Sequence, residues 1–433
     1  MKRAIPAVVS TAMALTLVLA GCGGEDEPVD PNAPVTITLA GWSLSSTPEF
    51  KTLADGFKAT HSNVTVELKE YDAANYDTQM IADLAAGTAP DVYVLKNLKN
   101  FYTYQSGGQL LDVSDAGSAL GELPALASYQ VDGKIYAVPY RQDSWVLYYN
   151  KELFDKAKVA HPTGTWTWDE YAAAAKQLTA GLKAAGSSAT GAYQHVWQST
   201  VQGFALAQTP GADLLSGDFA YLKPYYQRSL DLQAAGAQPT FGTANTNKLT
   251  YQAQFGKQQS AMLLMGTWYV ATLLNQRKSG EADTFDWGLA PAPQYDKSTA
   301  GTSATPVTFG DPTGMGINPK ISKSKVAAAQ AFLAYVASED AGKALAGIGI
   351  TPAQASDPIT TTLFALDGVP SDDLSKFAYG THEIRPENPV SKHTAGMQNV
   401  LNDLHSAVMS DSKGLDEAIA EAQTRAKNEV LNQ

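Results

Sequence analysis

The chain contains few of the residues that build disulfide frameworks or metal sites. Among its 433 residues there is one cysteine, Cys22, and the six histidines are scattered along the sequence. A single thiol cannot form an internal disulfide, and scattered imidazoles lack the short spacings of zinc ligands. We therefore expect a fold without disulfides, with no metal ion and no other cofactor.

Positive charge is also scarce. The chain has 31 Lys and Arg residues against 43 Asp and Glu residues, a formal net charge of −12, and its basic residues form no stripe. Such a surface repels phosphate backbones, so nucleic acid is not an expected partner.

The common catalytic signatures are missing from the sequence as well. It has no G-x-S-x-G, H-E-x-x-H or CxxC motif and no phosphate-binding G-x-x-x-x-G-K-[ST] loop. We therefore do not expect an enzyme. One enzymatic alternative stays open, because the many carboxylates could include the acid and the base of a secreted glycoside hydrolase.

Apolar runs of membrane-spanning length are absent, and the one notable apolar run lies at the N-terminus. Lys2 and Arg3 precede small and apolar residues over 4–20, which predicts a signal peptide over residues 1–21.

The single cysteine follows this run directly. Residues 19–22 read Leu-Ala-Gly-Cys and resemble the lipobox of bacterial lipoproteins. The resemblance implies that the sulfur of Cys22 is acylated and anchors the chain to a membrane. The alternative is an ordinary secretory signal with a cysteine there by chance. Residues 22–34, rich in Gly, Pro and acidic side chains, are predicted to form a flexible tether.

Beyond residue 34, strand and helix patterns alternate. Alternating β-branched residues at 35–40 and 64–68 predict strands, and apolar residues at helical spacing predict a helix over 49–60. A helix over 76–86 and a buried strand over 91–95 continue the pattern. This alternation predicts an α/β fold with a parallel-rich sheet.

The rest of the chain adds further elements. They are predicted strands at 135–139, 145–149 and 260–265, a helix starting at Thr167, and helices at 251–259, 268–274, 324–337 and 416–431. Residues 299–312 are rich in Gly, Thr, Ser and Pro, which indicates a connection between domains. About 410 residues after the signal peptide suggest two domains.

Four short sequence passages occur in an order that indicates a known family. They are AGTAPDV at 86–92, YAVP at 136–139 with YYNKELF at 148–154, PTGTWTWDE at 162–170, and 255–268 with its FGK start and GTW end. Their order and spacing resemble the family 1 extracellular solute-binding proteins, the maltose-binding-protein-like components of ABC importers. The resemblance extends over nearly all of the chain after the tether.

This resemblance implies a two-lobed, periplasmic-binding-protein-like α/β fold of class II type, with a hinge that the chain crosses three times. The lobes it implies are residues 35–142 with 305–348 and residues 143–304 with 349–433, and the crossings fall near 141–145, 294–307 and 348–352. It further implies a monomer outside the cytoplasm, lipid-anchored at the cell membrane, that captures a sugar or short oligosaccharide. The partners would be that ligand and the permease subunits of an importer.

Tryptophans are the first candidates for a sugar site, because sugar rings present C–H faces that stack on aromatic planes. Trp42 directly follows the first predicted strand, whose carboxyl end should face the crevice. Trp268 ends the G-x-W passage, where the family commonly places a stacking residue. Trp197 lies in a stretch without a predicted element. Each of the three could instead be a core tryptophan.

Polar candidates come from loops that should reach the cleft. Asp143 is the first choice because a carboxylate can accept bonds from two sugar hydroxyls, although a salt bridge to Arg141 is the alternative. The others are Ser43, Lys96, Asn97, Arg141, Gln198 and Asp311. The loop at 389–397 contains His393 and no tryptophan, unlike the best-known relatives, which argues against a long maltodextrin ligand.

A non-sugar ligand is the nearest alternative within the same fold. Such lobes also bind amino acids, peptides, polyamines and chelated iron. An iron site would use clustered tyrosines, but the pairs at 148–149 and 225–226 fit strand or helix packing better.

Overall fold

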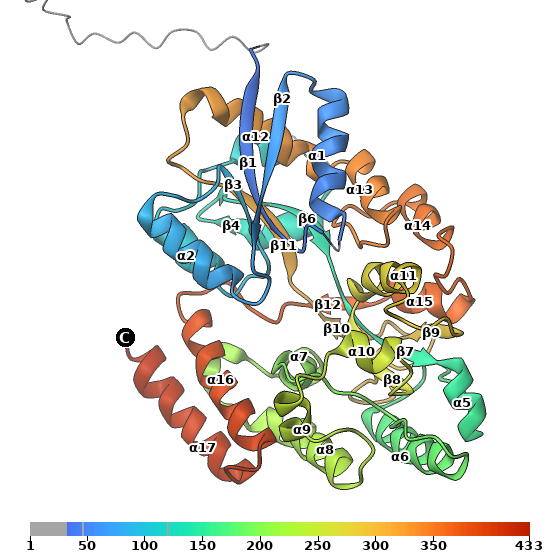
Figure 1. Cartoon of the computed structure of the whole chain (residues 1–433). Helices are drawn as coiled ribbons and strands as arrows, with labels where there is room; N and C mark the ends of the chain where they lie inside the picture. Colours follow the sequence, from blue (N-terminus) through green and yellow to red (C-terminus); the bar gives the residue numbers. More distant parts are fainter. Residues whose placement is uncertain (1–32, 46, 119, 121) are drawn as a thin grey trace, which may run out of the picture. The chain divides into compact units, whose positions relative to one another are not determined.

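The computed structural model describes residues 33–433 except positions 46, 119 and 121 (Figure 1). Residues 34–433 form one compact unit, distinct from residues 1–33. The predicted signal peptide and the lipidated Cys22 lie outside the described residues and stay predictions. Within the described part of the chain, no helix is both long enough and apolar enough to span a bilayer.

A five-stranded mixed sheet forms the core of the first lobe. Its strand order is β2 (Val64–Tyr71), β1 (Val35–Trp42), β3 (Val92–Leu95), β11 (Pro312–Ile317) and β6 (Val138–Gln142). β1 is parallel to β2 and β3, but β11 is antiparallel to β3 and β6. The parallel-rich prediction holds for the direction of β1, β2, β3 and β6. β11 is the one strand of this sheet that runs the other way, because the chain returns from the second lobe and enters the sheet between β3 and β6.

Helices cover this sheet and bury their apolar faces against it. α1 (Glu49–Thr60) and α12 (Lys323–Val336) contribute several fully buried side chains, and α2 (Tyr76–Ala86) contributes Tyr76 and Met80. α2 ends at Gly87, since the φ of +75° at that position favours glycine.

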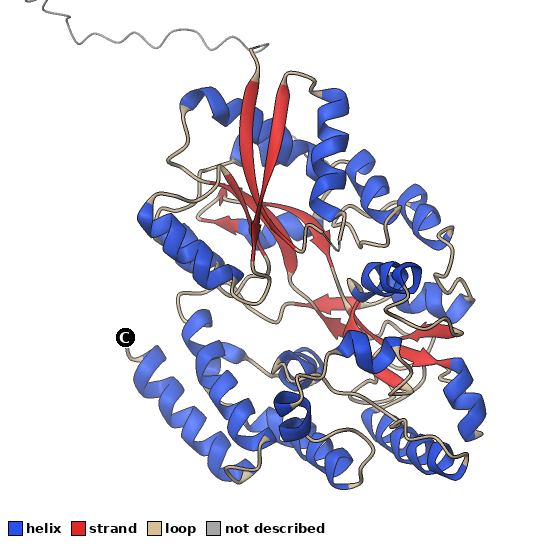
Figure 2. Ribbon diagram, in the orientation of Figure 1, coloured by secondary structure: helices blue, strands red, loops and turns tan. Residues whose placement is uncertain are grey.

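The second lobe is built on a three-stranded antiparallel sheet. β7 (Trp145–Asn150) lies between β8 (Met262–Gly266) and β9 (Trp287–Ala290). α6 (Trp168–Ala184) begins where the sequence predicted, with a capping box formed by Thr167 and Glu170. Figure 2 shows the strands of both sheets in red among the blue helices.

The remaining elements connect and cover these sheets. They are α3 (Phe101–Ser106), α4 (Ser114–Ser118), β4 (Gln130–Val131), β5 (Lys134–Ile135), α5 (Lys151–Ala157), α7 (Ser199–Gln208), α8 (Lys223–Ala234), α9 (Phe241–Thr246), α10 (Tyr251–Gly256), α11 (Tyr269–Ser279), β10 (Val307–Phe309), α13 (Glu339–Ala346), α14 (Asp357–Phe364), α15 (Asp373–Gly380), β12 (Glu383–Arg385), α16 (Thr394–Met409) and α17 (Leu415–Arg425). The predicted helix over 416–431 is α17 followed by a π-helical turn over Ala426–Leu431.

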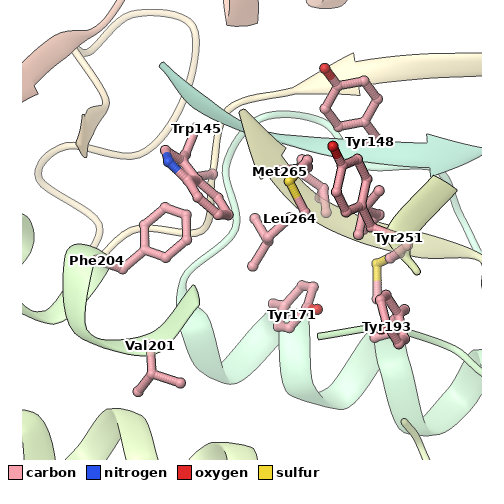
Figure 3. Packing of buried hydrophobic residues seen from close by; sticks show 14 of the residues in the cluster. Trp145, Tyr148, Tyr171, Tyr193, Val201, Phe204, Tyr251, Leu264 and Met265 are labelled. Carbon is pink, nitrogen blue, oxygen red and sulfur yellow. The ribbon is translucent and has the colours of Figure 1, made fainter. Parts of the chain in front are cut away.

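Two separate hydrophobic clusters mark the two lobes. One includes Leu39 and Phe332, and the other includes Trp145, Tyr148 and Phe204. Figure 3 shows the second cluster, where Trp145 faces Phe204 with ring centroids 6.1 Å apart. Each lobe therefore has its own core, which is the condition for two lobes that can move relative to each other.

The lobe boundaries expected from the sequence stay a prediction. Val307 and Phe309 pack in the cluster of the second lobe, although residues 305–348 were expected in the first. Ala353 packs against the cluster of the first lobe, although residues 349–433 were expected in the second.

Candidate functional site

Connections between the lobes run beside one another. One joins β6 to β7 and contains Asp143, another joins β10 to β11 and contains Gly310, and another contains Thr351. Gln142 donates its backbone N–H to the carbonyl oxygen of Thr351 at 3.3 Å. A β-carbon on Gly310 would lie 2.2 Å from the carbonyl oxygen of Asp143, so this approach requires a residue without a side chain.

Arg141, near the end of β6, is the centre of a buried ion-pair network. Its Nη1 lies 2.7 Å from Oε1 and 2.8 Å from Oε2 of Glu49, and its Nη2 lies 2.7 Å from Oδ2 of Asp143. Burial alone would lower the pKa of Arg141, but the two carboxylates raise it well above its usual value. The structure therefore contains the salt bridge that the sequence left as an alternative for Asp143.

Asp143 joins this network to the second lobe. Its Oδ1 accepts a hydrogen bond from Oγ1 of Thr267 at 2.9 Å, and Thr351 donates to the same hydroxyl at 2.8 Å. Burial raises the pKa of Asp143, while Arg141 and Thr267 act in the opposite direction. The carboxylate thus links β6 to the residue that follows β8. A contact between Asp143 and a ligand stays a prediction.

Trp268 is fixed by its neighbours and is only partly buried. Its ring lies over Gly266, where a β-carbon would come within 1.8 Å of the indole. It meets Trp145 edge-on with centroids 5.4 Å apart. The G-x-W passage therefore places one orientated indole at the end of β8.

Trp197 is the most exposed of the predicted aromatic residues, with 42% of its surface accessible. Its ring is edge-on to His195 at 4.4 Å and to Tyr251 at 5.7 Å between centroids. Tyr251 therefore packs against Trp197. Sequence reasoning missed Tyr251, because no local pattern distinguishes it from the many core tyrosines.

On the first lobe, Trp42 lies between α1 and α2. Its ring is edge-on to Phe50 and to Tyr76 at 5.1 Å each, and the ammonium of Lys96 lies 5.0 Å from its centroid. Burial lowers the pKa of Lys96, opposed by the carboxylate of Asp77. Trp42 and Lys96 thus form one cation–π pair at the carboxyl ends of β1 and β3.

Ser43 and Asn97 shape the two loops at those strand ends. Ser43 has a φ of +54°, and its carbonyl oxygen accepts the N–H of Thr47 at 2.8 Å. Oδ1 of Asn97 accepts the backbone N–H of Lys99 at 3.0 Å. Both residues are partly buried. Their contacts with a ligand stay predictions.

Asp311 is fully engaged by protein donors. Its Oδ1 accepts the N–H groups of Glu387 at 2.9 Å and Asn388 at 3.2 Å, and its Oδ2 accepts the N–H of Leu98 at 3.2 Å and the side-chain amide of Asn388 at 2.6 Å. Burial raises the pKa of Asp311, and these bonds oppose the shift. The geometry favours a structural role, and a ligand contact stays a prediction.

Gln198 and Lys99 reach the same helix from different lobes. The amide of Gln198 donates to the side chain of Gln398 on α16, and Nζ of Lys99 donates to Oδ1 of Asn399 at 3.0 Å. Sequence reasoning missed Gln398, Asn399 and Glu387. The expectation for the polar loop before α16 concerned an aromatic residue alone.

The comparison with protein families decides the identity of this fold. Residues 41–343 match the model described as bacterial extracellular solute-binding protein. The chain belongs to this family. A sugar transporter from Rhizobium etli, solved in an open conformation, has the same fold with a TM-score of 0.76 at 30% identity, covering 91% of this chain and 99% of that one. The predicted two-lobed fold is therefore confirmed.

Curated relatives of this solute-binding protein match it over shorter stretches. An uncharacterised lipoprotein from Streptomyces antibioticus is 31% identical over 177 residues. The melibiose/raffinose/stachyose-binding protein of Bacillus subtilis is 28% identical over 170 residues. Each match spans 38% of this chain and 38% of the relative, which is less than half the length of either relative.

The predicted residues of this solute-binding protein therefore come from both lobes and their connections. They are Trp42, Ser43, Lys96, Asn97 and Arg141 in the first lobe, Asp143 and Asp311 in the connections, and Trp197, Gln198 and Trp268 in the second lobe. The described residues contain no group of side chains that could hold a metal ion. The arrangement offers aromatic planes, neutral hydrogen-bonding groups and charged side chains, of which Arg141 and Asp143 are already paired with each other.

Proposed function

We propose that this solute-binding protein is the substrate-binding component of an ABC importer and takes a sugar or short oligosaccharide between its lobes. The observation that carries the proposal is that Trp42, Trp197 and Trp268 come from both lobes, and that Thr267, next to Trp268, bonds to Asp143 in a connecting segment. The sugar transporter from Rhizobium etli and the oligosaccharide-binding relative from Bacillus subtilis support this ligand class.

In this proposal, the aromatic rings stack on sugar C–H faces and neutral polar groups bind the hydroxyl rim. Trp197 offers the largest accessible plane, and the orientated indole of Trp268 offers a second. The amides of Gln198 and Gln398, already bonded to each other, supply donors and acceptors at the edge. None of these groups has to form or break a covalent bond.

A ligand that touches both lobes binds most tightly to the arrangement in which both contacts are made. This difference in affinity shifts the lobes toward a closed form, which a permease could recognise. The ion-pair network of Arg141 supports the same scheme, because it fixes the connecting segment about which such a movement would occur.

The proposal includes a lipid anchor at Cys22, which would hold a monomer at the outer face of the membrane. The lipobox-like sequence supports the anchor, and the relative from Streptomyces antibioticus is itself described as a lipoprotein. Metabolic labelling with a fatty acid, compared between the full chain and Cys22→Ser, tests this part independently of the ligand. Equal labelling of both would refute the anchor.

The test of the ligand is a thermal-shift screen of the chain from Glu25 onward. The panel contains mono- and oligosaccharides, with amino acids, polyamines and iron chelates as comparison sets. A ligand at a hundred times its Kd adds about 2.7 kcal/mol of stability, so a true ligand should be visible. Stabilisation by one sugar class supports the proposal, and stabilisation by non-sugars alone refutes the ligand class.

Incubation with oligosaccharides tests the hydrolase alternative. A binding protein should return the sugar unchanged, whereas a glycoside hydrolase would release shorter products.

A further inference from the structure

The short segment 195–197, just before α7, is held in place although it belongs to no helix or strand. The hydroxyl of Thr200 reaches the carbonyl oxygens of His195 at 3.1 Å and of Trp197 at 2.7 Å. Between them, Nε2 of His405 donates to the carbonyl oxygen of Val196 at 3.1 Å. Three consecutive carbonyl oxygens are therefore bonded by buried side chains, which fixes the positions from which His195 and Trp197 project.

Three rings meet at this segment. The centroids of His195 and Trp197 are 4.4 Å apart, those of His195 and Tyr251 are 5.3 Å apart, and those of Trp197 and Tyr251 are 5.7 Å apart. His195 and Tyr251 are buried, whereas Trp197 is exposed. The imidazole therefore lies directly against the accessible indole that we propose as a stacking surface.

The tautomer of His195 follows from its bond to Tyr193. The hydroxyl of Tyr193 lies 2.8 Å from the carbonyl oxygen of Leu249, which can only accept, so its single hydrogen points there. The same hydroxyl oxygen lies 3.1 Å from Nδ1 of His195 and therefore accepts a hydrogen bond from it. Nδ1 thus carries a hydrogen, and in a neutral imidazole this leaves a lone pair on Nε2.

This lone pair is available to a donor from outside the protein. Burial lowers the pKa of His195 to about 4, so the ring is neutral at neutral pH. Nε2 has no hydrogen-bond partner within the described part of the chain, and it is not among the polar atoms enclosed there without one. His405 differs in this respect, because Val196 and Tyr226 occupy both of its nitrogens.

We propose that His195 is a specificity-determining residue of the ligand site, and that its Nε2 accepts a hydrogen bond from a hydroxyl of the sugar that stacks on Trp197. A bare nitrogen accepts a hydroxyl hydrogen but repels the lone pairs of a carboxylate or phosphate oxygen, so this end of the site takes a neutral, hydroxylated ring. Tyr193 is a positioning residue, because its bond to Leu249 fixes the tautomer. This assignment rests on the proposed function.

The tautomer is tested without a sugar, on the chain from Glu25 onward. In a nitrogen-15 NMR spectrum, the chemical shift of each imidazole nitrogen shows whether that nitrogen carries a hydrogen. At pH 7, Nδ1 of His195 should be protonated and Nε2 bare. His405 is the internal control, because its bonds require the opposite tautomer. The spectrum of His195→Asn identifies the His195 signals by their loss.

Tyr193→Phe keeps the ring and removes the hydroxyl that fixes the tautomer. The spectrum should then show a mixture of both tautomers of His195. The Kd of the sugar should rise by about two- to fivefold, because only a fraction of the protein offers a bare Nε2. Tyr93→Phe removes a comparable buried hydroxyl, which donates to the carbonyl oxygen of Gln109 in the first lobe, and should leave both the spectrum and the Kd unchanged.

The contact itself is tested by calorimetry with the sugar of the panel that gives the largest thermal shift, and with analogues in which one hydroxyl at a time is replaced by hydrogen. One of these deoxy analogues should bind the native protein about three- to tenfold more weakly than the parent sugar, as for the loss of one hydrogen bond. His195→Asn retains an N–H donor for Tyr193 but has no acceptor in the place of Nε2. In this variant, the same hydroxyl should add nothing to the affinity.

Each outcome decides one claim. A hydrogen on Nε2 of His195 in the native spectrum would overturn the tautomer and the proposal with it. Equal losses for every deoxy analogue in native protein and His195→Asn would show that His195 contacts no hydroxyl. Failure of every sugar in the panel to stabilise the chain would refute the proposed function and the contact, while the tautomer would still be decided by the spectrum.

Discussion

The indole of Trp268 lies so close over Gly266 that a β-carbon at position 266 would come within 1.8 Å of the ring. Glycine at this position therefore sets the orientation of the tryptophan. The residue between them, Thr267, bonds to Asp143 in the connecting segment. Three consecutive residues thus couple a predicted stacking ring to the junction between the lobes.

Gly266→Ala should displace the indole and weaken sugar binding by about tenfold or more, since about 1.4 kcal/mol of lost contact is enough for that factor. Calorimetric titration with the sugar found in the screen measures the effect. Gly242→Ala is the matched control, because no atom lies within 4 Å of the β-carbon it would add. Unchanged affinity in Gly266→Ala would show that Trp268 does not contact the ligand.

Trp197→Ala should weaken binding by roughly tenfold to a hundredfold, as expected for the loss of a large aromatic contact in a binding site. The free energy of unfolding should change little, because 42% of the surface of Trp197 is already accessible to solvent. Fluorescence titration and thermal unfolding measure the two quantities separately. Tyr295→Ala removes another exposed aromatic ring, beside Arg385, and should leave the affinity unchanged.

Arg141→Met should destabilise the fold by about 3–5 kcal/mol, because it leaves the buried carboxylates of Glu49 and Asp143 without their cation. Urea unfolding measures the loss. Lys51→Met breaks the exposed pair with Asp55 and should cost less than about 1 kcal/mol. Similar losses in the two variants would contradict the importance assigned to the buried network.

His405 should make the second lobe sensitive to acid. Its Nε2 donates to the carbonyl oxygen of Val196 at 3.1 Å, and its Nδ1 accepts from the hydroxyl of Tyr226 at 3.1 Å, so the ring is held in its neutral form. Burial lowers its pKa to about 4 from 6.5. Between these values the unfolded chain binds the additional proton, so stability is lost as the pH falls.

The loss attributable to His405 should approach about 2–3 kcal/mol at pH 4, given about 1.4 kcal/mol for each pH unit between the two pKa values. Urea unfolding at pH 7, 5 and 4 measures it against His405→Gln, whose stability should depend less on pH. Parallel profiles for native protein and His405→Gln would contradict the assignment.

Local patterns were sufficient for most secondary structure. The capping box at Thr167, the left-handed stop at Gly87 and the apolar spacing of α1 each depend on residues within one or two turns. The resemblance to family 1 solute-binding proteins predicted in addition how the chain passes between the two lobes. These features could therefore be predicted from the sequence.

Long-range pairing could not be predicted in the same way. The bond between Asp311 and Glu387 joins residues 76 positions apart. No local pattern around either residue indicates that the other is its partner. Glu49 likewise reads as an ordinary acidic first residue of a helix, and only the fold brings it to Arg141. For the same reason, Asp143 had two open interpretations until its partners were known.

The position of β11 has a consequence for how the protein folds. β11 lies between β3 and β6, but it is separated from β6 along the chain by the whole second-lobe sheet. Until Pro312–Ile317 are synthesised and inserted, β3 and β6 have unpaired edges and the first lobe is incomplete. Such non-local pairing slows folding and exposes strand edges to aggregation. The first lobe therefore cannot complete its sheet before residues 312–317 are available.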